Sequence, residues 1–298
     1  MRPRNSLAIV AVALLSLSGC SLRPPDTGVF LDPSLAPLIP ADTTLILGAR
    51  VEKLSQTPLF SVVANLDMIG GFAREAGVDA ASRLWQVLLV SNGRRSIVLG
   101  HGKFTNGIIA PELARKGGTR FAYRGMNLFG DEQNAVLFIN SSTAIWGQTP
   151  VLRDIADQKG TGSGPPARLA TLMKEIPRET QLWGAYAGGT VNFPLTGNAQ
   201  NLTKVLGMLS AGMFYFDLTS GVNGLVTGVA ANAQDAQQVH DALEGFIGLG
   251  RMMAPKNQPD LQRLFDGVHV TQEAQRVRVQ IVEPEDLAAK LIGLLPKQ

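Results

Sequence analysis

The one reactive side chain with a distinctive neighbourhood is Cys20, the only cysteine in the 298 residues. It follows Ser18 and Gly19, small residues of the kind that a signal peptidase requires, and an apolar run from Leu7 to Leu17. Two arginines precede that run. A basic start, a short apolar segment and small residues in this order are typical of a cleaved secretion signal. The chemistry predicted here is cleavage of the chain beside a thiol.

The residues Leu17-Ser18-Gly19-Cys20 resemble the lipobox of bacterial lipoproteins. The resemblance implies cleavage between Gly19 and Cys20 and acylation of Cys20, with palmitate as a suitable label, so that Cys20 becomes a lipid-attached mature N-terminus. Ser21 follows the cysteine in place of Asp. In such lipoproteins of double-membraned bacteria this implies sorting to the outer membrane, facing the periplasm. Residues 1–19 are then the signal peptide, and the lipid bilayer is the expected partner of Cys20.

Two other interpretations of this segment stay open at this point. The apolar run could be an uncleaved membrane span, but a span needs about 20 apolar residues, and Ser6, Ser16 and Ser18 bracket a shorter stretch. Cys20 could also follow a plain signal peptide by chance. The order of the basic start, the apolar run and the small pair favours the lipoprotein.

Charge and composition exclude one class of partner. Cleavage removes Arg2 and Arg4 and no acidic residue, so 27 Lys and Arg minus 2 leaves 25 against 24 Asp and Glu. This balance, without a lysine–arginine block, predicts no nucleic-acid partner. The 45% hydrophobic content is sufficient for one large domain or two ordinary ones. Once Cys20 is acylated, no thiol remains for a disulfide, so burial alone must stabilise the fold.

A proline-rich tether is predicted for residues 20–38. Prolines recur through it without a helix or strand period. A fully extended tether up to Pro40 would reach about 60 Å at about 3.1 Å per residue. Val29, Phe30 and Leu31 could dock on the domain and shorten that reach.

Two related strings begin the globular part, Ile39-Pro40-Ala41-Asp42-Thr43-Thr44-Leu45 and Ile176-Pro177-Arg178-Glu179-Thr180-Gln181-Leu182. Similar patterns follow each string in the same order, which predicts an internal duplication. The fold expected is α+β, with two tandem repeats of strand, helix, hairpin, helix, strands and helix and mostly antiparallel sheets. The repeats span residues 39–158 and 176–298, joined by a Gly/Pro linker over 159–175.

Alternating apolar residues and turn signals predict the strands. In the first repeat they are 45–51, 85–91, 96–104, 119–124, 135–139 and 143–147, with 126–130 as a link. In the second repeat they are 182–187, 213–218, 224–231, 268–271 and 276–282.

Caps and 3.6-residue spacing predict the helices. One begins at Thr57-Pro58 and ends at Gly77, and others begin at Pro150 and Pro284. The longest begins at Asn232 and should bury one face, formed by Val239, Ala242, Leu243, Phe246, Ile247 and Gly250. Close backbone packing is expected at Gly245, Gly248 and Gly250, because glycine costs about 1 kcal/mol in a helix.

The mature chain resembles a group of bacterial envelope lipoproteins that has no assigned activity. The resemblance lies in the two repeated strings, Trp85-Gln86-Val87-Leu88 before Asn92-Gly93, Gly100-His101-Gly102-Lys103-Phe104, Tyr123-Arg124-Gly125 and Ser141-Ser142-Thr143-Ala144. The resemblance implies duplicated α+β halves and indicates no particular activity.

No catalytic or metal constellation is predicted. The three histidines, His101, His240 and His269, lie in separate elements. Gly100-His101-Gly102 lacks the third glycine of a dinucleotide loop, so a strand end that needs room is expected, and no cofactor. The acidic pairs Asp131-Glu132 and Glu285-Asp286 fit a turn and a first helical turn.

Three further patterns are assigned to packing. Arg120 and Arg124 share a strand face opposite Phe121 and Tyr123, as a half-buried strand requires. Trp85, Trp146 and Trp183 are expected in the core. Leu249, Met252 and Met253 either fill an irregular core, which is favoured, or line an adaptable groove.

Together these features predict an outer-membrane-anchored, periplasm-facing lipoprotein that acts as a non-catalytic binding or structural module, with envelope proteins as possible partners. Its first rival is a carrier of a lipid or other apolar ligand in a cleft between the repeats. The second is an envelope enzyme.

Overall fold

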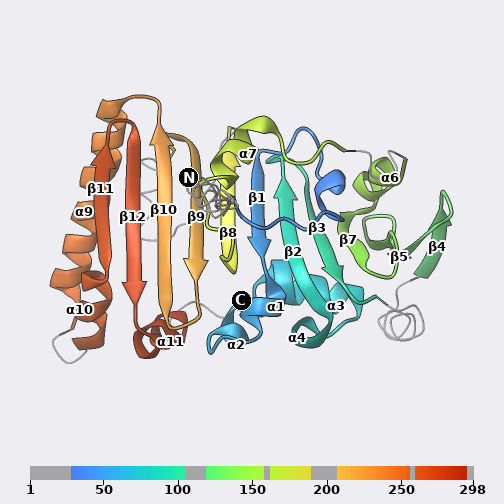
Figure 1. The fold of residues 1–298 in the computed structure, drawn as a ribbon, viewed down its shortest axis with the longest axis horizontal. Coiled ribbons are helices and arrows are strands. Elements are labelled where there is room, and N and C mark those ends of the chain that lie inside the picture. Colours follow the sequence, from blue (N-terminus) through green and yellow to red (C-terminus); the bar gives the residue numbers. More distant parts are fainter. Residues whose placement is uncertain (1–27, 105–118, 158–161, 189–206, 256–258, 294–298) are drawn as a thin grey trace, which may run out of the picture.

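In the computed structural model, the described residues are 28–104, 119–157, 162–188, 207–255 and 259–293. Twelve strands of this part form one sheet in the order β11-β12-β10-β9-β8-β1-β2-β3-β7-β6-β5-β4 (Figure 1). Every pair of neighbouring strands is antiparallel. The predicted α+β class with antiparallel pairing is therefore confirmed. The signal segment and Cys20 lie outside the described residues.

The strands occupy both predicted repeats. They are β1 (Leu45–Ala49), β2 (Leu84–Ser91), β3 (Ser96–Gly102), β4 (Thr119–Tyr123), β5 (Met126–Gly130), β6 (Asn134–Phe138), β7 (Thr143–Gln148), β8 (Leu182–Ala187), β9 (Leu209–Asp217), β10 (Val222–Ala230), β11 (Val268–Glu273) and β12 (Arg276–Glu283).

The helical elements are mostly short. They are η1 (Ala36–Leu38), α1 (Val51–Leu54), α2 (Phe60–Val63), the π-helical η2 (Asp67–Gly71), α3 (Phe72–Ala76), α4 (Ala80–Arg83), α6 (Thr149–Asp157), α7 (Ala167–Met173), α9 (Ala233–Met253), α10 (Pro259–Asp266) and α11 (Glu285–Gly293).

The pairing of β1 with β8 joins the two halves of the sequence at the middle of the sheet. Leu47 lies opposite Gly184, and the register runs without interruption from Leu45 to Ala49. All strands before α7 lie on one side of this junction, and all strands after it lie on the other (Figure 1). The halves therefore share one sheet.

A glycine–aromatic pair stabilises this junction. Gly48 lies opposite Trp183, and the indole, which is fully buried, occupies the space that a Cβ on Gly48 would need. The same arrangement recurs where Phe214 covers Gly184, its partner across β8 and β9. Aromatic rings packed over strand glycines fill the gap left by the missing side chain. The junction is thus held by packing as well as by its backbone ladder.

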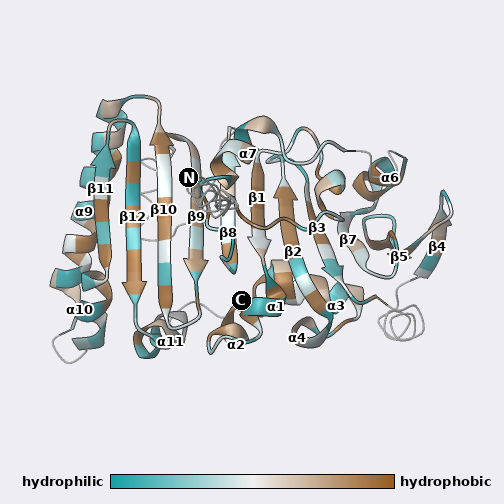
Figure 2. Ribbon diagram, viewed as in Figure 1, coloured by the Kyte–Doolittle hydropathy of each residue, from teal (hydrophilic) through white to brown (hydrophobic). Residues whose placement is uncertain are grey.

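Each face of the sheet has its own covering layer. Residues 28–39, which we call the strap, pack with α6 and α7 on one face, around a core that includes Trp183. Helices α1 to α3 cover the opposite face of the central strands. The helix α9 packs on the same face as α1 to α3, at the far end of the sheet. Val277 on β12 packs in one apolar cluster with α9, whereas its neighbour Arg276 points to the strap side and binds Glu175, just after α7. Figure 2 shows the resulting pattern, with apolar residues dominating β2 and alternating with polar residues along β12.

The predicted helix between Pro58 and Gly77 is wrong as a continuous element. The segment divides into α2, η2 and α3, and the Thr57 hydroxyl donates back to the carbonyl of Leu54 in place of capping. Only its end is as predicted, because Gly77 adopts a left-handed conformation with φ of +66°. Residues 126–130, expected as a link, form β5 and extend the sheet.

Two further expectations on helices need correction. The segment 159–175, predicted as a linker, contains α7, whose Leu169 and Leu172 are buried against the strap face. In α9 the cap is as predicted, since the Asn232 side chain accepts from the backbone N–H of Asp235. Phe246, however, is 42% exposed, and the space beside Gly245 and Gly248 is open. Of the three glycines, Gly250 alone packs closely, against Phe265.

The Trp183 contact predicts the effect of adding one methyl group. Gly48→Ala should lower the free energy of unfolding by about 1–3 kcal/mol, because the new Cβ overlaps the buried indole and the core must shift. Urea unfolding followed by circular dichroism measures the change. The matched control is Gly248→Ala in open space on α9, which should raise stability by up to about 1 kcal/mol through helix propensity. Equal stability of Gly48→Ala and the parent protein would contradict the role of this contact.

Candidate functional site

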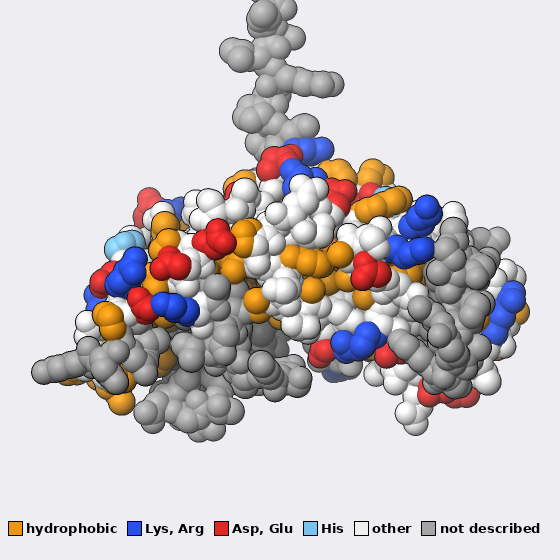
Figure 3. Space-filling model, turned by 90° about the horizontal axis from the view of Figure 1, so that it is seen from below, with side chains coloured by type: hydrophobic (Ala, Val, Ile, Leu, Met, Phe, Trp, Pro, Cys, Tyr) orange, Lys and Arg blue, Asp and Glu red, His pale blue; other side chains and the backbone are white. Residues whose placement is uncertain are grey.

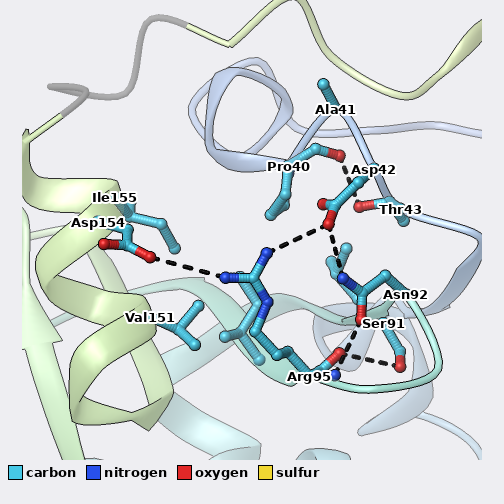
Figure 4. Close-up of a pocket in the computed structure, with 12 residues that line it drawn as sticks. Pro40, Ala41, Asp42, Thr43, Ser91, Asn92, Arg95, Val151, Asp154 and Ile155 are labelled. Atoms are coloured by element: carbon cyan, nitrogen blue, oxygen red, sulfur yellow. Dashed lines mark hydrogen bonds and ion pairs between the residues drawn. The ribbon is translucent and has the colours of Figure 1, made fainter.

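A pocket of about 310 Å³ lies beside α6, between the turn that precedes β1 and the ends of β2 and β3 (Figure 4). Its walls are apolar where Val90, Ile97, Val151 and Ile155 line it. Its charged residues are Asp42, Arg95 and Asp154.

Local turns position the charged residues of this pocket. The backbone N–H and the hydroxyl of Thr43 both donate to the carbonyl of Pro40, which fixes the turn that presents Asp42. On the facing hairpin, the Asn92 side chain accepts from the backbone N–H groups of Arg94 and Arg95. Both turns follow from their sequences, since proline and asparagine favour these conformations.

Arg95 joins two carboxylates across the pocket (Figure 4). Its guanidinium lies 3.2 Å from Asp42 and 3.6 Å from Asp154 on α6. Asn92 Nδ2 donates to the same oxygen of Asp42 at 2.6 Å. The hydrogen bond from Asn92 and the nearby Arg95 lower the pKa of Asp42 below its ordinary value. The Asp42 carboxyl is therefore ionised at neutral pH and has no proton to donate, so the geometry fits binding better than acid catalysis.

A second pocket, of about 480 Å³, lies beside the C-terminal end of α6. Leu38, Met126 and Ile139 contribute apolar surface, and Ile155 lines both pockets. Arg124 lies 2.8 Å from Asp157 at its margin. Arg120 on β4 binds the side chain of Asn127 instead. The prediction that Arg124 shares a strand face with Arg120 is wrong, because Arg124 lies in the turn after β4 with φ of +51°, so the two arginines have separate partners.

The strap is the second candidate site, because its contacts reach both halves of the sheet. The backbone N–H of Val29 donates to the carbonyl of Met173 on α7 at 3.1 Å. Buried Gln86 on β2 binds the strap backbone twice, accepting from the N–H of Asp32 and donating to the carbonyl of Phe30. The predicted docking of Val29 to Leu31 is confirmed, and the described part of the tether is packed on the sheet.

Two arginines hold the strap at the junction of the halves. The guanidinium groups of Arg50 and Arg178 lie 4.9 Å and 5.6 Å from the ring centre of Phe30. Arg50, which is 8% exposed, also binds Glu52 at 3.0 Å and Glu179 at 3.4 Å. Since Arg50 follows β1 and Glu179 precedes β8, these charges link the halves at the place where the strap crosses them.

The three histidines lie in separate parts of the structure. His101 lies 2.7 Å from Asp32 of the strap, His240 lies 3.0 Å from Asp241, and His269 is exposed on β11. In the described ranges no three His, Cys, Asp or Glu side chains come together as metal ligands do.

The tryptophan prediction is wrong for one residue. Trp183 is buried and Trp146 is half-buried, but Trp85 is 39% exposed, with its ring edge against His101 at 4.7 Å. The favoured core position of Met252 and Met253 is also wrong, because they are 75% and 71% exposed.

The glycine motif at Gly100-His101-Gly102 and the two acidic pairs have the packing, turn and helix-start positions predicted for them. A Cβ on Gly100 would meet Phe72, and one on Gly102 would meet the backbone of Arg83. Asp131 lies in a turn, where it accepts from the N–H groups of Gln133 and Asn134. Glu285 and Asp286 lie in the first turn of α11.

Sequence reasoning did not select Asp42, Arg95 and Asp154 as site residues. Asp42 belongs to the repeated string 39–45, and Arg95 follows the Asn92-Gly93 turn, so the sequence places both residues at turns. Nothing in the chain order indicates that α6 brings Asp154 to them.

Glu283 was also missed, although it is an unusual buried acid. It is 3% exposed at the end of β12, and neither carboxylate oxygen has a hydrogen-bond partner within the described residues. Burial raises its pKa, Asp266 raises it further, and Arg263 opposes the change. The side chain is therefore held in the folded protein more readily as the neutral acid.

Because the folded protein binds the Glu283 proton more tightly than the unfolded chain, stability should fall as pH rises above about 4.5 through the raised pKa. Glu283→Gln removes this dependence, so the variant should exceed the parent in stability by about 1–3 kcal/mol at pH 8 and by less at pH 4.5. Urea unfolding at several pH values measures the difference. Glu244→Gln, at an exposed position of α9, is the control. A constant difference between Glu283→Gln and parent across this range would refute the assignment.

Charges of both signs lie on one face of the molecule. Figure 3 shows basic and acidic side chains interspersed on the face seen from below, without a large area of one sign. No described helix has both the length and the apolar character needed to cross a membrane.

Comparison with known proteins yields a fold relationship. No protein-family model and no curated protein matches the chain. Its structure is similar to crystal form III of TP0453, with a TM-score of 0.56 and 13% identity over 89% of this chain and 99% of that one. Crystal form I gives a TM-score of 0.53 at 13% identity, over 89% and 98% of the two chains. Identity at this level shows a shared fold alone.

Proposed function

We propose that this protein is a lipoprotein of the bacterial envelope, attached through acylated Cys20 to the outer membrane and facing the periplasm, where it acts as a non-catalytic binding or structural module. The observation that carries the proposal is the strap. It connects the segment that would bear the lipid to both halves of a continuous sheet through Met173, Gln86, Arg50 and Arg178.

The strap limits how far the domain lies from its anchor. Gly28, the first described residue, is eight residues after Cys20. At no more than about 3.6 Å per residue, it lies within about 30 Å of the lipid-bearing residue. This is about half of the reach expected for a free tether. A short connection of this kind suits a module that presents its body close to the membrane surface.

We also propose that the halves are tandem repeats related by duplication. Ile39 and Ile176 begin the two related strings, and in both strings the threonine N–H donates to the proline carbonyl three residues before it. The strings are 137 positions apart (176 minus 39), and so are the paired residues Leu47 and Gly184 (184 minus 47). A residue that pairs with its own counterpart lies on a twofold axis.

The carrier remains the alternative, and the two pockets beside α6 favour it. The second is lined mainly by apolar side chains, the first by apolar and polar side chains together, and both have volumes suited to a small ligand. All their lining residues belong to the strap or the first half, however, whereas the alternative expects a cleft between the halves. The binding or structural module is therefore the proposed function, ahead of the carrier.

The anchor is tested at Cys20. Cys20→Ala should lose palmitate label and move the protein from the membrane fraction to the soluble fraction, because a lipid chain cannot be attached without the thiol. Radioactive palmitate labelling and fractionation of cell envelopes measure both effects. Ser21→Ala, which retains the thiol, is the control and should stay labelled. Label on Cys20→Ala, or its absence from the parent, would refute the anchor.

Module and carrier are separated by purification from detergent-solubilised membranes, with identification of associated proteins and extracted lipids. If the protein is a binding or structural module, the same discrete set of envelope proteins should copurify with the parent and with Ile155→Trp. This substitution fills the space shared by both pockets. Leu66→Trp, at an exposed position, is the matched control. One lipid per chain in the parent and in Leu66→Trp, lost from Ile155→Trp, would establish the carrier instead.

A further inference from the structure

The strand β11 ends the sheet on the side of the second half. Its six residues pair with β12 in an unbroken register, and among the residues described no strand pairs with its other side. Such an edge presents free N–H and C=O groups, which proteins usually protect with prolines, lysines or bulges. The sequence Val268 to Glu273 contains none of these. The opposite edge, β4, carries exposed Arg120, and exposed Arg124 follows it in a turn.

The side chains of β11 favour pairing with a second copy. His269, Thr271 and Glu273 are exposed and lie on one face of the strand. If two β11 strands pair antiparallel with Thr271 opposite Thr271, His269 of each copy lies opposite Glu273 of the other. An imidazole N–H can donate a hydrogen bond to a carboxylate that lies opposite it, and cross-strand polar pairs of this kind stabilise a sheet. Glu273 also lies 3.1 Å from Arg278 of β12 in its own chain. A shift by one residue would turn every side chain to the wrong face, so this register is favoured over its neighbours.

An apolar surface adjoins the same edge. The helix α9 packs along β11 at this end of the sheet (Figure 1). Its C-terminal half exposes four large apolar side chains, Phe246, Leu249, Met252 and Met253, at 42–75%. An exposed apolar cluster on a globular protein commonly marks an interaction surface. A chain that extends the sheet at β11 also comes next to α9.

We propose that β11 is the interface at which two copies of this protein associate, about a twofold axis through Thr271 and perpendicular to the sheet. Such an axis leaves the strap of both copies on the same side. If the anchor of the proposed function is correct, both lipid chains then reach one bilayer. The dimer itself does not depend on the anchor.

Thr271→Cys tests the interface directly in the full-length chain. Residues opposite each other in an antiparallel pair have Cα atoms about 4.5–5.5 Å apart, within the range of a disulfide. Mild oxidation should therefore convert most of the variant to a covalent dimer on a non-reducing gel. The parent controls for links through Cys20. Gln280→Cys, exposed on the same face of β12, is the matched control and should remain monomeric.

A charge exchange gives an independent measurement. His269→Glu places like charges opposite each other and should weaken self-association measured by light scattering by at least about tenfold, which corresponds to about 1.4 kcal/mol. The double variant His269→Glu with Glu273→His should restore it. A monomeric parent together with a monomeric Thr271→Cys would overturn the proposal. Adducts of Thr271→Cys with a different protein would likewise overturn it, by assigning the edge to that partner.

Discussion

The antiparallel contact between β1 and β8 is the constraint on which the rest of the structure depends. It lies between the two halves, so the other strand pairs extend the sheet outwards from it. Trp183 packs over Gly48 at this position and leaves no room for a side chain there. A single glycine therefore allows the largest buried side chain to fill the centre of the molecule. The sheet is continuous across the two halves because β1 pairs with β8 along its full length.

The same junction organises the charged groups. Arg50 and Glu179 flank it from the two halves, and Phe30 of the strap lies against Arg50 and Arg178. A buried guanidinium is costly unless it has several partners, and here the ion pairs and the aromatic ring provide them. The N-terminal segment thus completes the environment of Arg50. This explains why a proline-rich segment with only one short helical turn, η1, still packs firmly on the sheet.

The sequence predicts local features of this fold better than long-range ones. Strands with clear alternation and the cap at Asn232 lie where they were expected, because neighbouring residues determine them. The helix after Thr57 fails, since its apolar residues serve tertiary packing through separate short turns and a π-helical segment. Trp85 and Phe246 are exposed although their spacing suggested burial. Burial depends on which elements cover a face, and the chain order does not specify that.

Long-range arrangement also explains why the pocket residues were not found. Asp42 and Arg95 are 53 positions apart, and Asp154 joins them from α6. The twofold relation that we propose at β1 and β8 would keep one face of the sheet on the same side in both halves, because an axis perpendicular to an antiparallel sheet exchanges strands without exchanging faces. Pairing at β11 would repeat that geometry between molecules. A protein fixed to a membrane by one face can associate in this way while both anchors point to the same surface.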